Sequence, residues 1–242
     1  MMRILALDAG NTRIKWGLHD GKSWLEQGWE STADAARLES AWQKLAAPDQ
    51  IIASNVAGPA VRKQMEAACK HWPAAVHWAV ADKSRCGVHN GYEQPAQLGS
   101  DRWAALIAAR AIVPDGCVVV NAGTALTADV LSAEGVFLGG IIVPGLAAMQ
   151  HALAGSTAAV TAAGGGWKNF PANTADAAYS GALAALAGAV ERMAGALAGE
   201  QGCPPLCLLS GGDAAVLQPL LSGRTLMVDN LVLEGLIRIA LA

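Results

Sequence analysis

The chain has 242 residues, enough for one large domain or two smaller ones. Hydrophobic residues make up 53% of it and charged residues 15%, which argues against intrinsic disorder, because disordered chains are poor in apolar residues and rich in charge. The formal net charge of −3 gives no electrostatic reason to expect nucleic acid or an acidic membrane surface as the partner.

The first half opens with short strands and tight turns. An apolar, β-rich run ends at Asp8, and a turn through Gly10 leads into a second strand-like stretch. A further turn at 19–22 leads into a third stretch, so the alternation and the turn residues predict a β-meander. The elements expected in this half are strands at 3–8, 14–18, 24–28 and 51–56, and helices at 33–45, 60–70 and 101–111.

The opening pattern returns in the second half. An apolar run ends in Asn121-Ala122-Gly123, 113 positions after Asp8-Ala9-Gly10. A repeat of this length indicates duplicated domains rather than a solenoid, whose units are shorter. We therefore expect domains at 1–115 and 116–242 with a ligand cleft between them. The elements expected here are strands at 118–120, 126–131, 136–140 and 206–210, and helices at 146–153, 176–198 and 231–241.

The turn Asp8-Ala9-Gly10-Asn11-Thr12 is a candidate phosphate site. Its backbone N–H groups and polar side chains can face phosphate oxygens, while Asp8 can hold Mg²⁺ against them and Lys15 adds positive charge. The same residue types also form ordinary hairpins, and the turn alone slightly favours that interpretation. A second glycine turn at Gly123-Thr124 shifts the balance, because a nucleotide in a cleft needs donors from both walls. The chain contains neither a Walker A loop nor a Rossmann fingerprint.

The segment Gly99-Ser100-Asp101-Arg102 holds a candidate catalytic base. Ser100 is a natural N-cap, which places Asp101 and Arg102 in the first turn of the helix that follows. Acidic residues in a first turn also stabilise a helix through its dipole, so a purely structural role is the alternative. A kinase that acts on an alcohol uses a carboxylate to position the hydroxyl and accept its proton. Arg102 could hold a substrate carboxylate in bidentate fashion.

Taken together, these segments resemble the type III pantothenate kinases of the actin-like ATPase superfamily. No single segment is decisive, but their order and spacing along almost the whole chain are specific to that family. The segments are Asp8 to Thr12 with Lys15, Gly99 to Arg102, Gly123-Thr124-Ala125 with Asp129, Gly139 to Gly145, Asn173 to Asp176 with Gly181, and Ser210 to Asp213.

The resemblance implies an α/β fold of two related actin/ribonuclease H-like domains, with mixed sheets flanked by helices and an interdomain cleft. It also implies transfer of a phosphoryl group from ATP to pantothenate, the first step toward coenzyme A, by a cytoplasmic homodimer. Asp101 would be the catalytic base, and Asp8 would hold Mg²⁺. ATP would be bound by Asp8, Ala9, Gly10, Asn11, Thr12, Arg13, Ile14, Lys15 and Thr124. Pantothenate would be bound by Tyr92, Gly99, Ser100, Asp101, Arg102 and Thr174, with Arg102 facing its carboxylate.

The sequence departs from the family pattern at one position. In the family the second glycine turn usually begins with Asp, which is associated with a bound monovalent cation. Here the position is Asn121, whose amide keeps an oxygen ligand but loses the charge. We therefore expect a weak or absent requirement for K⁺ or NH₄⁺.

Two other functions compete with pantothenate phosphorylation. The first is a different actin-like kinase, acting on a sugar or on acetate, although Arg102 beside Asp101 favours an alcohol that bears an acid. The second is a non-catalytic, nucleotide-binding regulator. The presence of both Asp8 and Asp101 argues against an inactive kinase, and the lack of a basic patch argues against direct DNA binding.

The remaining signals place the protein in the cytoplasm. The apolar run at the start is short and ends at Asp8, unlike a signal peptide. The stretch 181–199 is apolar but interrupted by Glu191 and Arg192, which indicates a packed helix rather than a membrane span. Five cysteines, an odd number without a CxxC pair, indicate reduced thiols and no zinc site.

Overall fold

The computed structural model describes residues 2–157, 160 and 164–242, and the chain forms two compact units. Unit 1 comprises residues 1–112 and 230–242, and unit 2 comprises residues 113–229. The division after residue 112 lies near the expected one after residue 115. The last 13 residues, however, belong with unit 1, because their helix α7 (Leu231–Leu241) packs there and not with the residues that precede it.

Unit 1 is built on a mixed sheet with the strand order β3-β2-β1-β4-β5. The strands are β1 (Ile4–Ala9), β2 (Arg13–His19), β3 (Trp24–Ser31), β4 (Gln50–Asn55) and β5 (Val76–Trp78). Strands β1, β2 and β3 form the expected antiparallel meander, and β4 and β5 continue the sheet in parallel. The carboxyl ends of β1 and β4 therefore meet at one edge, where ligands bind in open α/β sheets.

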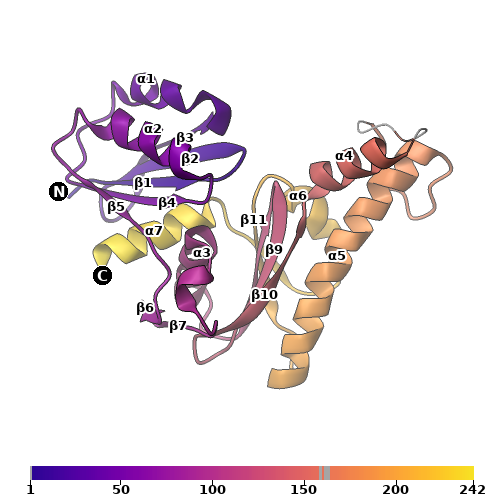
Figure 1. Ribbon diagram of the computed structural model, residues 1–242. Coiled ribbons are helices and arrows are strands. Elements are labelled where there is room, and N and C mark those ends of the chain that lie inside the picture. Colours follow the sequence, from indigo (N-terminus) through magenta and orange to yellow (C-terminus); the bar gives the residue numbers. More distant parts are fainter. Residues whose placement is uncertain (1, 158–159, 161–163) are drawn as a thin grey trace. The chain divides into compact units, whose positions relative to one another are not determined.

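The two faces of this sheet are covered by different helices. Leu5, Leu7 and Ala9 point to one face and join a core that includes residues of the helices after β3 and β4. The opposite face, toward which Ile4 and Asp8 point, packs against α7. The covering elements are η1 (Thr32–Arg37), α1 (Leu38–Trp42) and α2 (Pro59–Cys69) on the first face, and α3 (Ser100–Ile112) with α7 on the second. Figure 1 shows α3 and α7 side by side.

Two details of unit 1 differ from the sequence-based expectation. The helix expected at 33–45 is a 3₁₀ segment followed by a single short α-helix, because the backbone of Asp34 is not helical (φ −106°, ψ 27°). The segment before α3, expected only as a turn, contains the short hairpin of β6 (Ser84–Arg85) and β7 (Val88–Asn90), followed by η2 (Pro95–Gln97).

Unit 2 repeats the same strand arrangement. Its strands follow the order β12-β11-β8-β9-β10, with β8, β9 and β10 antiparallel and β11 and β12 parallel. Strands β8 and β1 share the same sequence of buried and half-buried positions, and so do β9 and β2. The strands are β8 (Cys117–Ala122), β9 (Ala125–Leu131), β10 (Val136–Pro144), β11 (Leu206–Ser210) and β12 (Thr225–Met227). The predicted duplication is thus present in the two sheets.

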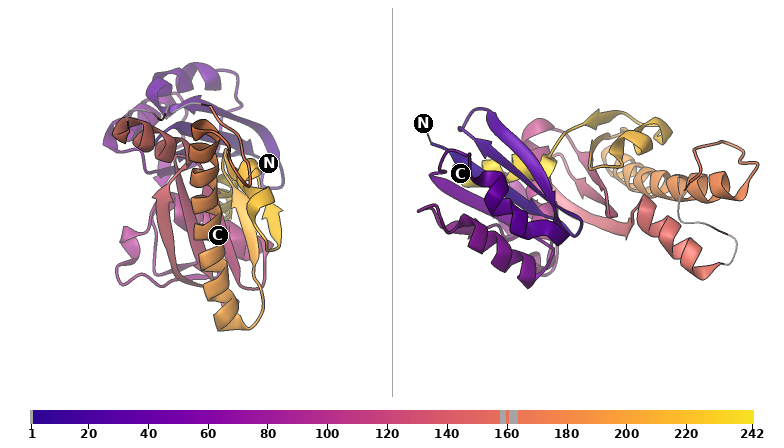
Figure 2. Two further views of the ribbon diagram at one scale, coloured as in Figure 1. Left: turned by 90° about the vertical axis from the view of Figure 1, so that its right-hand side faces the viewer. Right: turned by 90° about the horizontal axis from the view of Figure 1, so that it is seen from above.

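One long helix covers one face of the second sheet. Figure 2 shows α5 (Thr174–Gln201) running along the strands of unit 2, and its buried side chains join those of β8 and β9 in one core. Within the described part of the chain, α5 has the length and apolar composition of a membrane span, a test that core helices of soluble proteins also pass. The other helical elements are α4 (Leu146–Ser156), α6 (Ala214–Leu217) and η3 (Gln218–Leu220). The strand expected at 136–140 extends as β10 to Pro144, and the helix expected at 146–153 follows as α4.

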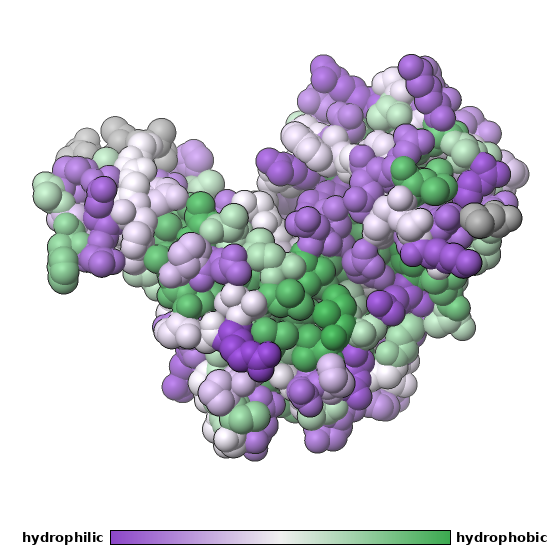
Figure 3. Space-filling model, turned by 180° about the vertical axis from the view of Figure 1, so that it is seen from behind, coloured by the Kyte–Doolittle hydropathy of each residue, from purple (hydrophilic) through white to green (hydrophobic). Residues whose placement is uncertain are grey.

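The apolar composition of the chain is visible at the surface as well as in the cores. Hydrophilic side chains cover most of the face shown in Figure 3, but a hydrophobic area lies among them. Tryptophans likewise occur both in the cores and at the surface: Trp42 and Trp103 are fully buried, whereas Trp29 is 56% exposed.

Candidate active site

A row of polar residues crosses the sheet of unit 1 where its parallel strands end. Lys15 on β2 is the register partner of Asp8 on β1, and Asp8 in turn pairs with Ser54 on β4. Register partners point to the same face of a sheet, so the three side chains lie side by side on the face opposite the core of Leu5 and Leu7. The fold thus brings a cation, a carboxylate and a buried hydroxyl to one edge.

The turn between β1 and β2 is tied down at both ends. The backbone N–H of Gly10 donates to the Arg13 carbonyl (3.0 Å), and the Thr32 hydroxyl donates to the Gly10 carbonyl (2.7 Å). The Thr32 backbone N–H donates to the carbonyl of Thr12 (3.0 Å). The side chains of Asn11, Thr12 and Arg13 are exposed, whereas Ala9 and Ile14 are buried in the core and can offer a ligand only their backbone.

The carboxyl group of Asp8 lacks the partners that a buried carboxylate needs. Its Oδ1 is buried and makes no hydrogen bond within the described structure. Burial raises the pKa of Asp8, the nearby Asp101 carboxylate also raises it and Lys15 lowers it, and together they bring this pKa to about 7. A buried acceptor without a donor is costly, and a cation placed against it would relieve that cost.

The helix α3 brings Asp101 to the same edge. Asp101 lies in the first turn of α3, as expected. Ser100 does not cap the helix as predicted, because it is the first helical residue and the Gly99 carbonyl accepts the first helical bond, from Trp103 N–H (2.9 Å). The Ser100 hydroxyl instead lies 2.9 Å from that of Ser54. A Cβ at Gly99 would lie 2.5 Å from Asp101 Oδ1, so a larger residue there would require the carboxylate to move.

Arg102 and Tyr92 form a second cluster beside Asp101. Arg102 is buried, and its guanidinium donates to the Tyr92 hydroxyl (3.1 Å). Tyr92 lies on the loop after β7, where its backbone N–H donates to the Asn90 side-chain oxygen (3.1 Å). The Asn90 side chain therefore helps to fix the backbone of the loop that carries Tyr92. Sequence spacing alone did not reveal this contact across ten residues.

The site residues expected in the second half lie in unit 2. Asn121 is the penultimate residue of β8 and lies in register with Thr127, and Thr124 is exposed in the turn that follows. Gly145 donates its backbone N–H to the Thr124 carbonyl (3.0 Å), and a Cβ at Gly145 would collide with the Gly123 carbonyl. Thr174 is exposed at the start of α5, next to Asn173, whose side chain caps that helix by accepting from Asp176 N–H (2.9 Å).

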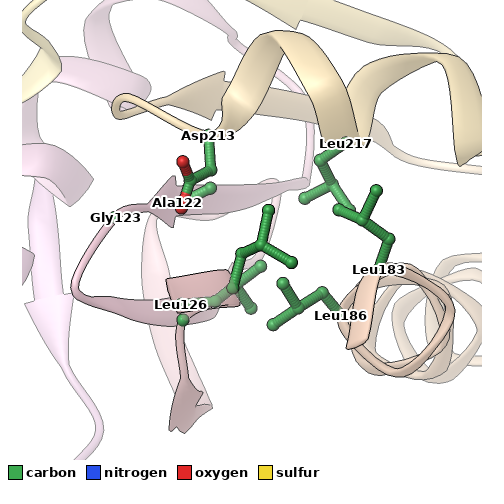
Figure 4. A pocket seen from close by; sticks show the side chains of 9 residues that line it. Ala122, Gly123, Leu126, Leu183, Leu186, Asp213 and Leu217 are labelled. Carbon is green, nitrogen blue, oxygen red and sulfur yellow. The ribbon is translucent and has the colours of Figure 1, made fainter. Parts of the chain in front are cut away.

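The hollow beneath the Gly123-Thr124 turn is packed core rather than a ligand pocket. Figure 4 shows Leu126, Leu183, Leu186 and Leu217 pointing toward one another, with Asp213 beside the end of β8. The space between them has no room for a water molecule. The apolar layer under this turn therefore supports the turn as part of the core.

The carboxylates of unit 1 suit Mg²⁺ better than zinc. In the part of the chain that the structure describes, no three His, Cys, Asp or Glu side chains gather as metal ligands would. Mg²⁺ keeps several waters and is usually held by one or two carboxylates together with substrate phosphates. Asp8, with its unpartnered buried oxygen beside Lys15 and the phosphate turn, fits that requirement.

Sequence reasoning missed Ser54, although its counterpart Ser210 was part of a segment that carries the family resemblance. Ser54 is fully buried beside Asp8, and Ser210 on β11 holds the same register position beside Asn121. A signal was available for Ser54, because it is a polar residue that directly follows the apolar run Ile51-Ile52-Ala53 near the carboxyl end of a strand. That position marks the ligand edge of an α/β sheet.

Comparison with known proteins identifies the family. Residues 4–196 match the family model described as type III pantothenate kinase. A type III pantothenate kinase from Nitrosospira multiformis is 50% identical over 237 residues, which cover 98% of this chain and 90% of the relative.

Two solved structures share the fold at low sequence identity. A structure from Campylobacter jejuni described as a conserved Baf family transcriptional activator has a TM-score of 0.63 at 20% identity, covering 97% of this chain and 96% of that one. A glucokinase from an Antarctic psychrotroph has a TM-score of 0.51 at 13% identity, covering all of both chains. These two likenesses extend to the fold alone. The family match and the identity of the Nitrosospira relative go further, and the chain belongs to the type III pantothenate kinase family.

Proposed function

We propose that the protein transfers the γ-phosphoryl group of ATP to the primary hydroxyl of pantothenate, the first step toward coenzyme A. The observation that carries the proposal is the cluster of Asp8, Asp101 and Arg102 at one edge of unit 1, in a chain of this family. In the reaction the hydroxyl oxygen forms a bond to the γ-phosphorus, the bond from that phosphorus to ADP breaks, and the hydroxyl proton is lost.

Asp101 is the proposed acceptor of that proton. It is anchored in the first turn of α3, near the positive end of the helix dipole, where a carboxylate also stabilises the helix. Arg102 follows it directly and is oriented by the Tyr92 hydroxyl, so we propose that this pair binds the pantothenate carboxylate. Gly99 and Ser100 would line the same subsite through their backbone, since the Ser100 hydroxyl is engaged with Ser54.

Asp8 and the turn that follows are the proposed triphosphate site. Asp8 would hold Mg²⁺, which when bound neutralises charge on the β- and γ-phosphates. The exposed residues Asn11, Thr12 and Arg13 would offer donors to the phosphates, and Lys15 would add charge beside Asp8. Ala9 and Ile14 are buried, which limits their proposed role to backbone contacts.

Further features belong to the same proposal. Thr124 would contact ATP and Thr174 would contact pantothenate, since both are exposed on turns that the family uses for ligands. The active unit would be a cytoplasmic homodimer. Asn121, lacking a charge, would leave only a weak dependence on K⁺ or NH₄⁺.

The test is an ADP-release assay with Mg-ATP and a panel of acceptors that contains pantothenate, hydroxylated acids lacking its amide arm, acetate and hexoses. We expect ADP release that depends on pantothenate, and a product whose mass is increased by one phosphoryl group. ADP release at saturating glucose or acetate but not with pantothenate would overturn the proposed acceptor. Protein that binds Mg-ATP without turnover on any acceptor would instead support a regulatory role.

A further inference from the structure

An exposed tryptophan continues the polar row of the proposed phosphate site. Trp29 on the edge strand β3 is the register partner of Lys15, which is the partner of Asp8. Its side chain therefore points to the face of the sheet that carries Asp8. At 56% exposed, Trp29 contributes little to the core, and its neighbour Gly28 instead lies against the buried ring of Trp16 on the other face.

The ring of Trp29 is covered by Arg13. The guanidinium carbon of Arg13 lies 4.5 Å from the ring centroid, well within the range in which an aromatic face attracts a cation. Arg13 directly follows the phosphate turn, and its carbonyl accepts the hydrogen bond from Gly10 that closes this turn. Arg13 and Lys15 are two residues apart on β2, so both cations occur on the same face.

We propose that Trp29 is a positioning residue for the nucleotide: its ring holds the Arg13 guanidinium beside Lys15, so that two cations face the triphosphate. The proposal rests on the proposed function of this edge as the ATP site. Two carboxylates, Asp8 and Asp101, lie near the same edge and repel phosphate. Lys15 supplies one positive charge against them, and Arg13 as a second cation further offsets this repulsion. A free arginine side chain would lose rotamer freedom on binding phosphate, and holding it in advance reduces that loss.

The central experiment compares Mg-ATP binding and turnover in Trp29→Ala, Trp29→Phe, Arg13→Ala and the double variant Arg13→Ala/Trp29→Ala. We expect Trp29→Ala to raise the Kd and KM for Mg-ATP by about two- to fivefold, the factor that an exposed cation–π contact implies, with kcat nearly unchanged. Trp29→Phe keeps an aromatic face and should restore most of the affinity. The double variant should bind no more weakly than Arg13→Ala, because Trp29 acts through that arginine.

Two matched controls separate this effect from general changes to unit 1. Leu25→Ala removes another exposed apolar side chain from β3, and Arg62→Ala removes an arginine that lies 4.4 Å over the Trp78 ring away from the site. Both should leave the Kd for Mg-ATP unchanged. The proposal is overturned by an unchanged or lowered Kd in Trp29→Ala, or by additive losses in the double variant. Binding of Mg-ATP is measured without pantothenate, so a wrong acceptor would abolish turnover while leaving the effect of Trp29 on Kd intact.

Discussion

The sheets of the two units share a framework but carry different polar residues at equivalent positions. In unit 1 the row across the sheet is Lys15, Asp8 and Ser54, and in unit 2 it is Thr127, Asn121 and Ser210. In both rows one buried oxygen has no partner within the described structure, Oδ1 of Asp8 and Oγ1 of Thr127. Only the row of unit 1 carries formal charges. The duplicated framework therefore supplies the same sheet edge twice, and only the row of unit 1 carries the charges on which the proposed phosphate site depends.

The turns above the two rows are also held in the same way. In each unit the residue that follows the third strand of the meander donates its backbone N–H to the turn: Thr32 to the Thr12 carbonyl, and Gly145 to the Thr124 carbonyl, both at 3.0 Å. The turn of unit 2 is one residue shorter, because Gly123 and Thr124 alone separate β8 from β9. The longer turn of unit 1 presents more exposed donors, which suits the triphosphate, whereas the shorter one presents Thr124 alone.

The largest effect should come from removing the Asp101 carboxylate, which α3 brings to the row of unit 1. Asp101→Asn should lower kcat by roughly 10²–10⁴, because the amide cannot accept the hydroxyl proton. The Kd for Mg-ATP, measured by calorimetry, should change little. Glu39→Gln is the matched control, since Glu39 is an exposed carboxylate in the first turn of α1, away from the site. Unchanged turnover in Asp101→Asn would reduce Asp101 to a helix-stabilising residue.

A smaller effect should distinguish Asp8 from Asn121, because only Asp8 makes the free energy of unfolding depend on pH. Burial raises the pKa of Asp8 from 3.8 to about 7, so the folded protein keeps this proton over a pH range in which the unfolded chain has lost it. Below about pH 4 the carboxyl group is protonated in both the folded and the unfolded protein, and the folded protein has its full stability. As pH rises from there to about 7, the unfolded chain ionises first, so the folded protein loses stability. The free energy of unfolding of the ligand-free protein, relative to that of Asp8→Asn, should fall across this window by on the order of 2–4 kcal/mol.

Urea unfolding at pH 4.5, 5.5, 6.5 and 7.5 measures this difference, and Asn121→Ala serves as the control in unit 2. Asn121 does not titrate, so its variant should follow the pH profile of the wild type. Added Mg-ATP should reverse the loss above pH 6, because a cation favours the ionised carboxylate. Parallel profiles for the wild type and Asp8→Asn would show that the environment of Asp8 does not resist ionisation.

Most of the framework could be predicted because its signals are local and strong. Hydrophobic alternation and tight turns placed both meanders, and the amphipathic pattern placed α7 at its observed bounds of Leu231–Leu241. The strands β5, β6, β7 and β12 were missed, since two or three residues are too few to show a period. The membership of α7 in unit 1 was missed for another reason: the pattern identifies an apolar face but not the sheet that it covers.

The residue types of the site were easier to predict than their contacts. Asp8, Asp101 and Arg102 stood out because carboxylates and cations beside glycine turns suggest phosphate chemistry. The pairing of Ser100 with Ser54 could not be predicted, because it depends on how α3 packs at the end of β4, 46 residues earlier. For the same reason Ser100 was taken for a helix cap, a role that needs only local sequence.

The smallest expected effect tests whether the missing charge in unit 2 matters. Asn121→Asp would give the row of unit 2 the carboxylate found in the row of unit 1. We expect K⁺ to raise the turnover of this variant by about fivefold, because a carboxylate and K⁺ at about 4 Å in water attract each other by roughly 1 kcal/mol. The wild type should respond less. Choline chloride at equal ionic strength controls for screening, because a large organic cation cannot replace K⁺ between oxygen ligands. Wild-type activity that is absent without K⁺ would contradict the expectation, and would mean that the neutral oxygens of Asn121, Thr127 and Ser210 suffice to hold the cation.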